Sequence, residues 1–152
     1  MSETAQSVAT PLGRLTLVAR GETLTALRWG GHGTDRTPLL SWAAEQLAAY
    51  FNGELQVFDL PLTLDNGVLQ SQVQRAMLAI PYGETRTYGD IARALGAPAQ
   101  AIGQACGANQ LPVIIPCHRV LGASGLGGYS GQGGVEAKVA LLRLEGAAGL
   151  LI

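Results

Sequence analysis

The spacing of apolar positions predicts strands in the first part of the chain. Apolar runs at Arg14–Arg20 and Leu24–Trp29 flank the turn residues Gly21-Glu22, a pattern that predicts a β-hairpin. The stretch Leu55–Leu64 is typical of a further strand, and Pro61 within it requires an edge or a bend because proline has no N–H to donate. We therefore expect a small antiparallel sheet near the amino terminus.

Helical spacing of apolar residues predicts three longer helices. The first starts at Pro38, placed as an initial helical residue, and ends at Asn52-Gly53. The second covers Val68–Ala79 and the third covers Val135–Glu145. The third helix has three apolar residues on the stripe that we expect to face the core: Val135, Val139 and Leu142.

Two shorter helices between these form a possible helix-turn-helix. Thr87 is a good N-cap for a helix at Tyr88–Leu95, and Gly96-Ala97 makes a tight turn. Pro98 then opens a second helix that ends near Gly107. This second helix carries no Lys or Arg, unlike a helix that reads the major groove. Two interpretations stay open: the slim helix packs tightly against a neighbour, or it approaches a narrow minor groove.

The turn Asp65-Asn66-Gly67 is the expected domain boundary, because the charge balance changes there. Residues 1–66 hold four arginines against seven acidic residues, whereas residues 67–120 hold four arginines against two. We predict an α+β protein with an amino-terminal domain at 1–66, built from an antiparallel sheet and a helix. A mainly helical helix-turn-helix domain then covers 67–152.

The composition limits the class of protein. Apolar residues make up 47% and charged residues 14% of the chain, which is typical of a globular protein, and the net charge of −1 argues against a generic nucleic-acid coat. No apolar stretch approaches the roughly 20 residues that span a bilayer. Two cysteines without a CxxC pattern predict neither a disulfide framework nor a zinc site. A reducing, cytoplasmic setting is the expectation.

The segment Pro116–Arg119 holds the candidate chemistry. Cys117 lies beside His118 in a chain with only two cysteines and two histidines, and a neighbouring histidine lowers the pKa of a thiol. Neighbours on an extended strand point to opposite faces, so either the backbone turns here or a water relays the proton. From these residues alone, a nucleophile and a small buried hydrophobe remain about equally open.

The stretch Ile114–Val120 is similar to the active-site signature of O6-alkylguanine-DNA alkyltransferases, which are suicide DNA-repair proteins. Further motifs of the family occur in order along nearly the whole chain: Pro11–Gly13, Phe58–Leu62, Ile80–Glu84, Thr87–Gly89, Asn109, Gly128–Gly131 and Leu144–Gly146. The resemblance implies a methylated-DNA–protein-cysteine S-methyltransferase that acts once, without cofactor or metal. It implies a monomer that binds alkylated double-stranded DNA through the minor groove.

The resemblance also implies a role for individual residues. Cys117 would attack the alkyl carbon on O6 of a flipped-out guanine, with His118 as base through a bridging water and Glu145 orienting that histidine. Asn109 would brace the site, and Tyr88 would reach N3 of the leaving guanine. The implied DNA contacts are Tyr88, Arg93, Ala99 and Gln100. The implied pocket residues are Cys106, Val120, Tyr129 and Ser130, the last donating to O6.

One departure from the family pattern concerns DNA handling. Gln100 stands where family members carry an arginine that fills the gap left by the flipped base. The difference predicts transfer that is slower, or less dependent on duplex DNA. Two alternative functions remain open: a non-transferring alkyltransferase-like protein that marks lesions, whose relatives replace the cysteine, and a redox protein that uses Cys106 and Cys117.

Overall fold

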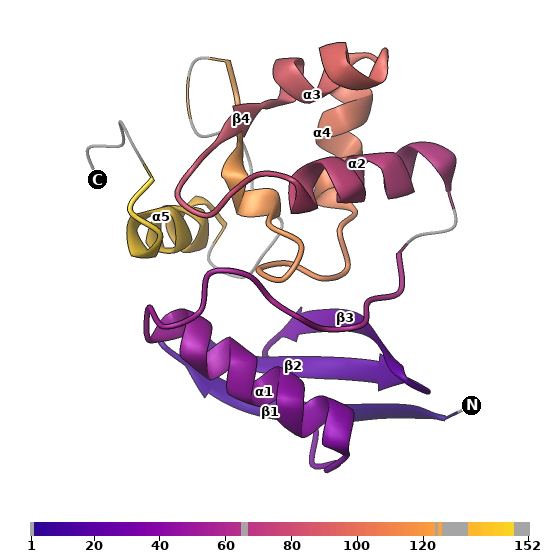
Figure 1. Cartoon of the computed structure of the whole chain (residues 1–152), viewed down its shortest axis with the longest axis vertical. Coiled ribbons are helices and arrows are strands. Elements are labelled where there is room, and N and C mark those ends of the chain that lie inside the picture. The colour runs from indigo at the N-terminus through magenta and orange to yellow at the C-terminus, as the bar shows by residue number, and fades with distance from the viewer. Residues whose placement is uncertain (1, 65–66, 124, 126–133, 148–152) are drawn as a thin grey trace. The chain divides into compact units, whose positions relative to one another are not determined.

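The structure is a computed structural model that describes residues 2–64, 67–123, 125 and 134–147. The chain forms two compact units, Met1–Thr63 and Leu64–Ile152 (Figure 1). The first unit contains an antiparallel sheet and a helix, and the second is mainly helical. The α+β class predicted from the sequence is confirmed.

The first unit is a three-stranded antiparallel sheet with one helix packed against it (Figure 1). Strands β1 (Glu3–Thr10), β2 (Gly13–Arg20) and β3 (Thr23–Trp29) lie in sequence order, and helix α1 covers Pro38–Phe51. The predicted hairpin and helix are therefore confirmed. The central strand β2 has five consecutive buried residues, and α1 contributes the buried side chains of Leu40, Ala43, Leu47 and Tyr50.

Two strand expectations need correction. The strand expected at Leu55–Leu64 is wrong, because only a single bridge between Leu24 and Leu62 forms there. Pro61 contributes its carbonyl oxygen to Leu24 N at 2.9 Å but has no N–H with which to extend a ladder. The sequence pattern also missed β1, whose residues ETAQSVAT show no clean alternation and which gains its order from pairing with β2.

The second unit surrounds the Cys117 turn with short elements. They follow the order α2 (Val68–Leu78), β4 (Arg86–Thr87), α3 (Tyr88–Leu95), α4 (Ala99–Gly107), the 3₁₀ turn η1 (Cys117–Arg119), β5 (Val120–Leu121) and α5 (Val135–Leu144). Helix α2 and the two short helices lie where the sequence predicts them. No helix among the described residues is long and apolar enough to cross a membrane.

The start of α3 is fixed by a reciprocal cap and by a strand pair. The Thr87 hydroxyl oxygen accepts from Asp90 N at 3.0 Å, and the Asp90 carboxylate accepts from Thr87 N at 2.9 Å, which is a capping box. Gly96 ends the helix with φ of 67°, a left-handed value that glycine adopts without strain. Strand β4, directly before α3, pairs in parallel with β5, directly after the Cys117 turn. The strand pair links the helix-turn-helix to that turn.

Helix α5 buries a different face from the one predicted. Its buried residues are Ala137, Lys138, Leu141 and Leu142, whereas Val135 is 44% exposed. Of the predicted stripe only Leu142 is fully in the core. The buried face includes Lys138. The spacing of apolar residues could not predict this face, because charged residues are rarely fully buried.

Candidate active site

The segment before Cys117 is a tight buried turn held by one amide side chain. All ten residues from 111 to 120 are buried. Asn109 donates from Nδ2 to the Ile115 carbonyl at 2.9 Å, and its Oδ1 accepts from Leu111 N at 3.1 Å. Val113 has φ of 72°, which costs free energy for a β-branched residue and persists only where the surroundings impose it. The contacts of Asn109 support the bracing role expected for it.

Cys117 and His118 occupy successive positions of the 3₁₀ turn η1. The backbone therefore turns at this point, which is one of the two possibilities raised by the sequence. Successive residues of a 3₁₀ helix, with about three residues per turn, point roughly 120° apart. The imidazole does not face the thiol directly on that geometry, so proton transfer between them calls for an intermediary.

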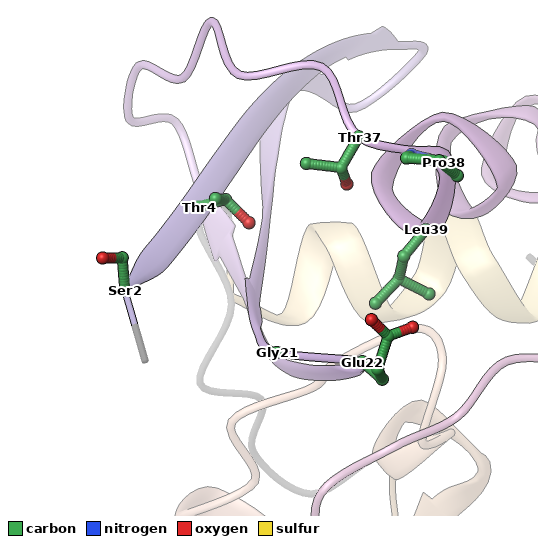
Figure 2. A pocket seen from close by; sticks show the side chains of 7 residues that line it. All are labelled: Ser2, Thr4, Gly21, Glu22, Thr37, Pro38 and Leu39. Carbon is green, nitrogen blue, oxygen red and sulfur yellow. The ribbon is translucent and has the colours of Figure 1, made fainter.

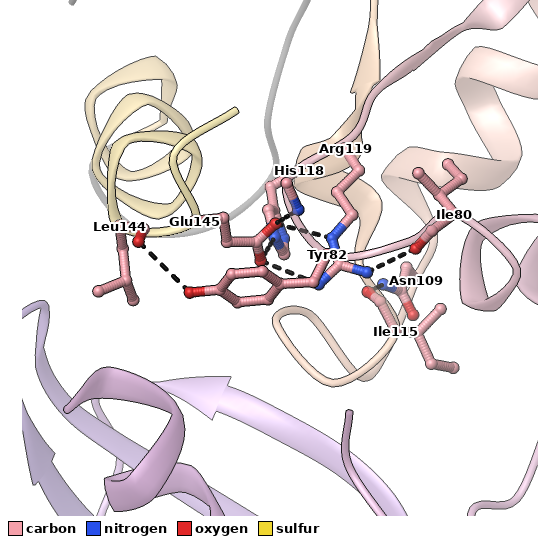
Figure 3. A network of polar contacts seen from close by, with 9 residues as sticks. Ile80, Tyr82, Asn109, Ile115, His118, Arg119, Leu144 and Glu145 are labelled. Carbon is pink, nitrogen blue, oxygen red and sulfur yellow. Dashed lines mark hydrogen bonds and ion pairs between the residues drawn. The ribbon is translucent and has the colours of Figure 1, made fainter. Parts of the chain in front are cut away.

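A buried network of polar contacts joins His118 and Arg119, the two residues after Cys117, to Glu145 (Figure 3). His118 Nε2 is 2.7 Å from Glu145 Oε2, and both side chains are fully buried. Arg119 donates from Nε to Glu145 Oε1 at 2.8 Å and from Nη2 to Oε2 at 3.0 Å. Glu145 is the C-cap of α5, where the helix dipole disfavours an acid, and the two partners offset that cost.

The network fixes the protonation state of His118. Burial lowers the pKa of the imidazole below its ordinary 6.5, with Arg119 and Lys138 adding to the lowering and Glu145 opposing it. The ring is therefore neutral near pH 7. Because Nε2 meets a carboxylate, the single proton sits there, and Nδ1 carries a lone pair. Nδ1 is buried and makes no hydrogen bond within the described part of the chain. The imidazole can thus act as a base through Nδ1.

A second cationic side chain lies beside the thiols. Lys138 is fully buried, donates from Nζ to the Val120 carbonyl at 2.6 Å, and lies 5.9 Å from the centroid of the Tyr88 ring. Burial lowers the pKa of this lysine, and the nearby Cys117 and Cys106 partly restore it. Burial, followed by the same two cysteines, raises the pKa of the Tyr88 phenol. Tyr88 therefore stays protonated and able to donate.

The two cysteines differ in chemistry. Burial, with a further contribution from Cys117, raises the pKa of the Cys106 thiol to about 12. Cys106 is then a protonated, unreactive thiol near neutral pH, since the thiolate is the nucleophilic form. Both cysteines are buried. The redox alternative, which needs two exchanging sulfurs, loses support.

Three of the four residues expected to contact DNA lie on exposed faces of the helix-turn-helix, whereas Tyr88 is half-buried. Arg93 on α3 and both Ala99 and Gln100 at the start of α4 are exposed. A Cβ built at Gly103 or Gly107 would meet no atom of the described residues within 4 Å, so packing within this part of the chain does not explain either glycine. The close-packing interpretation of α4 holds only for its other face, which buries Ile102, Ala105 and Cys106.

The remaining pocket expectations are only partly placed. Val120 is buried in β5, next to the turn. Tyr129 and Ser130 lie outside the described residues. Sequence reasoning gave no role to Arg119 or Lys138. Arg119 lies within the signature Ile114–Val120, so the sequence offered a signal for it. Lys138 is identified only by its complete burial in the structure. No group of three or more His, Cys, Asp or Glu residues suited to a metal occurs among the described residues.

A separate pocket lies in the first unit (Figure 2). Its lining residues are Ser2, Thr4, Gly21, Glu22, Thr37, Pro38 and Leu39. Glu22 is the one titratable side chain among them. The pocket therefore presents no pairing of nucleophile and base comparable with the one at Cys117.

Two family profiles cover most of the chain. The one described as "6-O-methylguanine DNA methyltransferase, ribonuclease-like domain" matches residues 5–64, and the one described as "6-O-methylguanine DNA methyltransferase, DNA binding domain" matches residues 68–147. The chain belongs to the 6-O-methylguanine DNA methyltransferase family.

Individual members of the family agree with this assignment. A methylated-DNA–protein-cysteine methyltransferase of Mycobacterium tuberculosis is 47% identical over 151 residues, covering 92% of this chain and 90% of that protein. A constitutive one of Bacillus subtilis is 47% identical over 112 residues, covering 72% of this chain and 67% of that protein. The crystal structure of Mycobacterium tuberculosis OGT in complex with DNA matches with a TM-score of 0.85 and 47% identity, over 94% of this chain and 92% of that one.

The buried, neutral His118 predicts a specific dependence of stability on pH. The folded-state pKa lies below the ordinary 6.5, so below that pH the unfolded chain binds a proton that the folded chain does not. The free energy of unfolding should therefore fall as the pH drops below 6.5, by up to about 1.4 kcal/mol per pH unit from this residue. Urea titrations at several pH values measure the slope.

His118→Gln should remove this part of the slope, while His32→Gln, at an exposed loop position, serves as the matched control. An unchanged slope in His118→Gln would show that the imidazole is charged in the folded protein.

Proposed function

We propose that the protein repairs DNA by transferring an alkyl group from O6 of guanine irreversibly to its own Cys117. The observation that carries the proposal is the imidazole of His118, held neutral with its free nitrogen Nδ1 aimed away from Glu145, directly beside the cysteine in a 6-O-methylguanine DNA methyltransferase. This arrangement supplies a nucleophile and a base without metal.

The proposed reaction balances as a single displacement. His118 Nδ1 takes the proton of the Cys117 thiol through one bridging water, which satisfies the geometric limit of the 3₁₀ turn. Sγ forms a bond to the alkyl carbon as the bond between that carbon and O6 breaks, and the electron pair stays on O6. His118 then releases its proton to solvent and the departing base gains one. The products are a thioether and ordinary guanine, and the protein acts once.

The surrounding residues support the leaving base and the geometry. Burial raises the pKa of the Tyr88 phenol and keeps it protonated, and we propose that it donates to N3 of the guanine. Asn109 holds the turn that carries the thiol. Cys106, Val120, Tyr129 and Ser130 are proposed to line the pocket, with Ser130 donating to O6.

The proposed DNA partner enters along the exposed face of the helix-turn-helix. The reacting bond is inaccessible inside a stacked duplex, so the base must flip out. Gly103 and Gly107 place no side chain at two positions of α4, which suits close approach to the minor groove. Gln100, Ala99 and Arg93 are exposed nearby in the same motif. We propose that the protein acts as a monomer, in a reducing cytoplasm that keeps the thiol reduced.

A non-transferring lesion marker is the alternative function. The presence of Cys117, with His118 and Glu145 bonded behind it, argues against that alternative because a marker has no need of an activated thiol. Transfer is therefore the better-supported function.

The central test mixes the protein with a duplex oligonucleotide containing O6-methylguanine and measures the mass of the intact protein. We expect the mass of one methyl group to be added, at most one per chain, and Cys117→Ser to abolish the addition. Cys106→Ser should still accept the methyl group. Tight binding without a change of mass would support the marker function instead.

Gly103→Ala on α4 should separate stability from DNA binding. Alanine favours a helix interior over glycine by roughly 1 kcal/mol, and its Cβ meets none of the described residues within 4 Å, so the free energy of unfolding should rise. If the minor groove approaches this face, the added methyl group weakens affinity for DNA, measured by fluorescence anisotropy. Unchanged affinity would contradict the proposed face. Gln72→Ala, at an exposed position of α2, is a control for the binding assay.

Gln100→Arg should speed repair of duplex DNA. A longer, charged side chain can fill the gap left by the flipped base and pair with the orphaned cytosine. Single-turnover rates on duplex and single-stranded substrates measure the effect, which we expect on the duplex only. Equal rates for the variant and the parent protein would count against this assignment of Gln100.

A further inference from the structure

The guanidinium of Arg119 binds three acceptors at once (Figure 3). Nε and Nη2 donate to the two oxygens of Glu145, at 2.8 and 3.0 Å, and Nη1 donates to the Ile80 carbonyl at 2.6 Å. Its carbon Cζ lies 5.8 Å from the centroid of the Tyr82 ring. The side chain is only 8% exposed. Each nitrogen of a buried cation is thus given a defined acceptor, and two of them share the carboxylate that binds His118.

We propose that Arg119 is a positioning residue for alkyl transfer: its fork fixes the Glu145 carboxylate against His118 Nε2 and keeps the imidazole neutral, so that Nδ1 remains a proton acceptor. The proposal rests on the proposed function of Cys117 for its kinetic consequence. The proposed effect of Arg119 on the protonation of His118 concerns the protein before it reacts and can be tested without methyl transfer.

The charges explain why an arginine is needed at this point. Glu145 and His118 are both fully buried, so a lone carboxylate there would be costly and would draw a proton. That proton would go to the imidazole, making an ion pair, or to the carboxyl itself. In the first case both ring nitrogens become donors, and in the second the carboxylic acid donates to Nε2 and moves the ring proton to Nδ1. Either outcome removes the acceptor that faces away from Glu145.

The other groups around His118 act in known directions. Glu145 raises the pKa of the imidazole, whereas burial, Arg119 and Lys138 lower it. Lys138 donates from Nζ to the Val120 carbonyl at 2.6 Å. Tyr82 lies against the guanidinium, and its phenol pKa is raised by burial and by Glu145. Arg119 combines its electrostatic effect on His118 with two direct hydrogen bonds to Glu145.

The geometry also distinguishes arginine from lysine. A guanidinium makes two parallel bonds to a carboxylate and a third to a carbonyl, while an ammonium is a point charge without that fork. The positive charge of residue 119 and its forked hydrogen bonding can therefore be tested by separate substitutions. Arg119→Gln removes the charge, and Arg119→Lys keeps the charge and loses the fork.

The experiment measures the resting protein first. The ¹⁵N and ¹H shifts of His118 report its tautomer and its protonation across the pH range, without DNA. We expect the neutral ring with its proton on Nε2 in the parent protein. In Arg119→Gln, the ring should take up a proton at higher pH or move its proton to Nδ1. Arg143→Gln, which removes an exposed cation from the last turn of α5, should leave the ring unchanged.

The single-turnover rate of methyl transfer is then measured for the same variants across the pH range. In Arg119→Gln the acid limb of the pH profile should move to higher pH, with a rate at least about tenfold lower on that limb. In Arg119→Lys the limb should stay in place while the rate falls at every pH. A purely structural role would lower the amount of folded protein and leave both the ring state and the profile of the folded fraction unchanged, which would overturn the proposal.

Two outcomes keep the inference separate from the proposed function. If the parent protein transfers no methyl group, the proposed function fails, and the ring measurement still decides the role of Arg119. If Arg119→Gln does not fold, Arg119→Lys decides it: an unchanged transfer rate at every pH would overturn the positioning role, and a lowered rate with an unmoved acid limb would support it.

Discussion

The second unit depends on one shared carboxylate. Glu145 receives His118 on one oxygen and Arg119 on both, in a place without access to water. Buried ion pairs of this kind add little net stability, because the cost of removing charges from water offsets their attraction. They do specify an arrangement, since removing Glu145 or Arg119 leaves the other as an unpaired charge in the interior. Here the arrangement specified is an imidazole with a fixed proton and a fixed lone pair.

Placing that carboxylate requires agreement among distant segments. Helix α5 brings Glu145 to its end, the 3₁₀ turn η1 supplies His118 and Arg119, and the chain after α2 supplies the Ile80 carbonyl. The turn itself is forced into shape by Asn109 and includes the positive φ of Val113. The strained backbone and the buried charges occur in the same place, as expected at functional sites, where local structural rules are broken and the cost is compensated elsewhere.

Some of this organisation is readable from the sequence and some is not. Thr87 with Asp90, and Gly96, are local signals whose meaning does not depend on the rest of the chain, and they located α3. The expected strand at Leu55–Leu64 failed because apolar composition does not supply a partner strand. Strand β1 was missed for the opposite reason, since pairing with β2 orders a polar stretch. Lys138 was hidden because its place in the core depends on the Val120 carbonyl and the Tyr88 ring, both distant in sequence.

The short parallel pair of β4 and β5 has a mechanical consequence. It joins Arg86 to Val120 and Thr87 to Leu121, so the first residue of α3 and the last residue of the thiol turn are separated by a single ladder. Tyr88, which begins α3, and Cys117, which begins the turn, are thus connected through this strand pair as well as along the chain. In the proposed reaction, the phenol that would donate to the base and the sulfur that would accept the alkyl group are therefore positioned by the same short ladder.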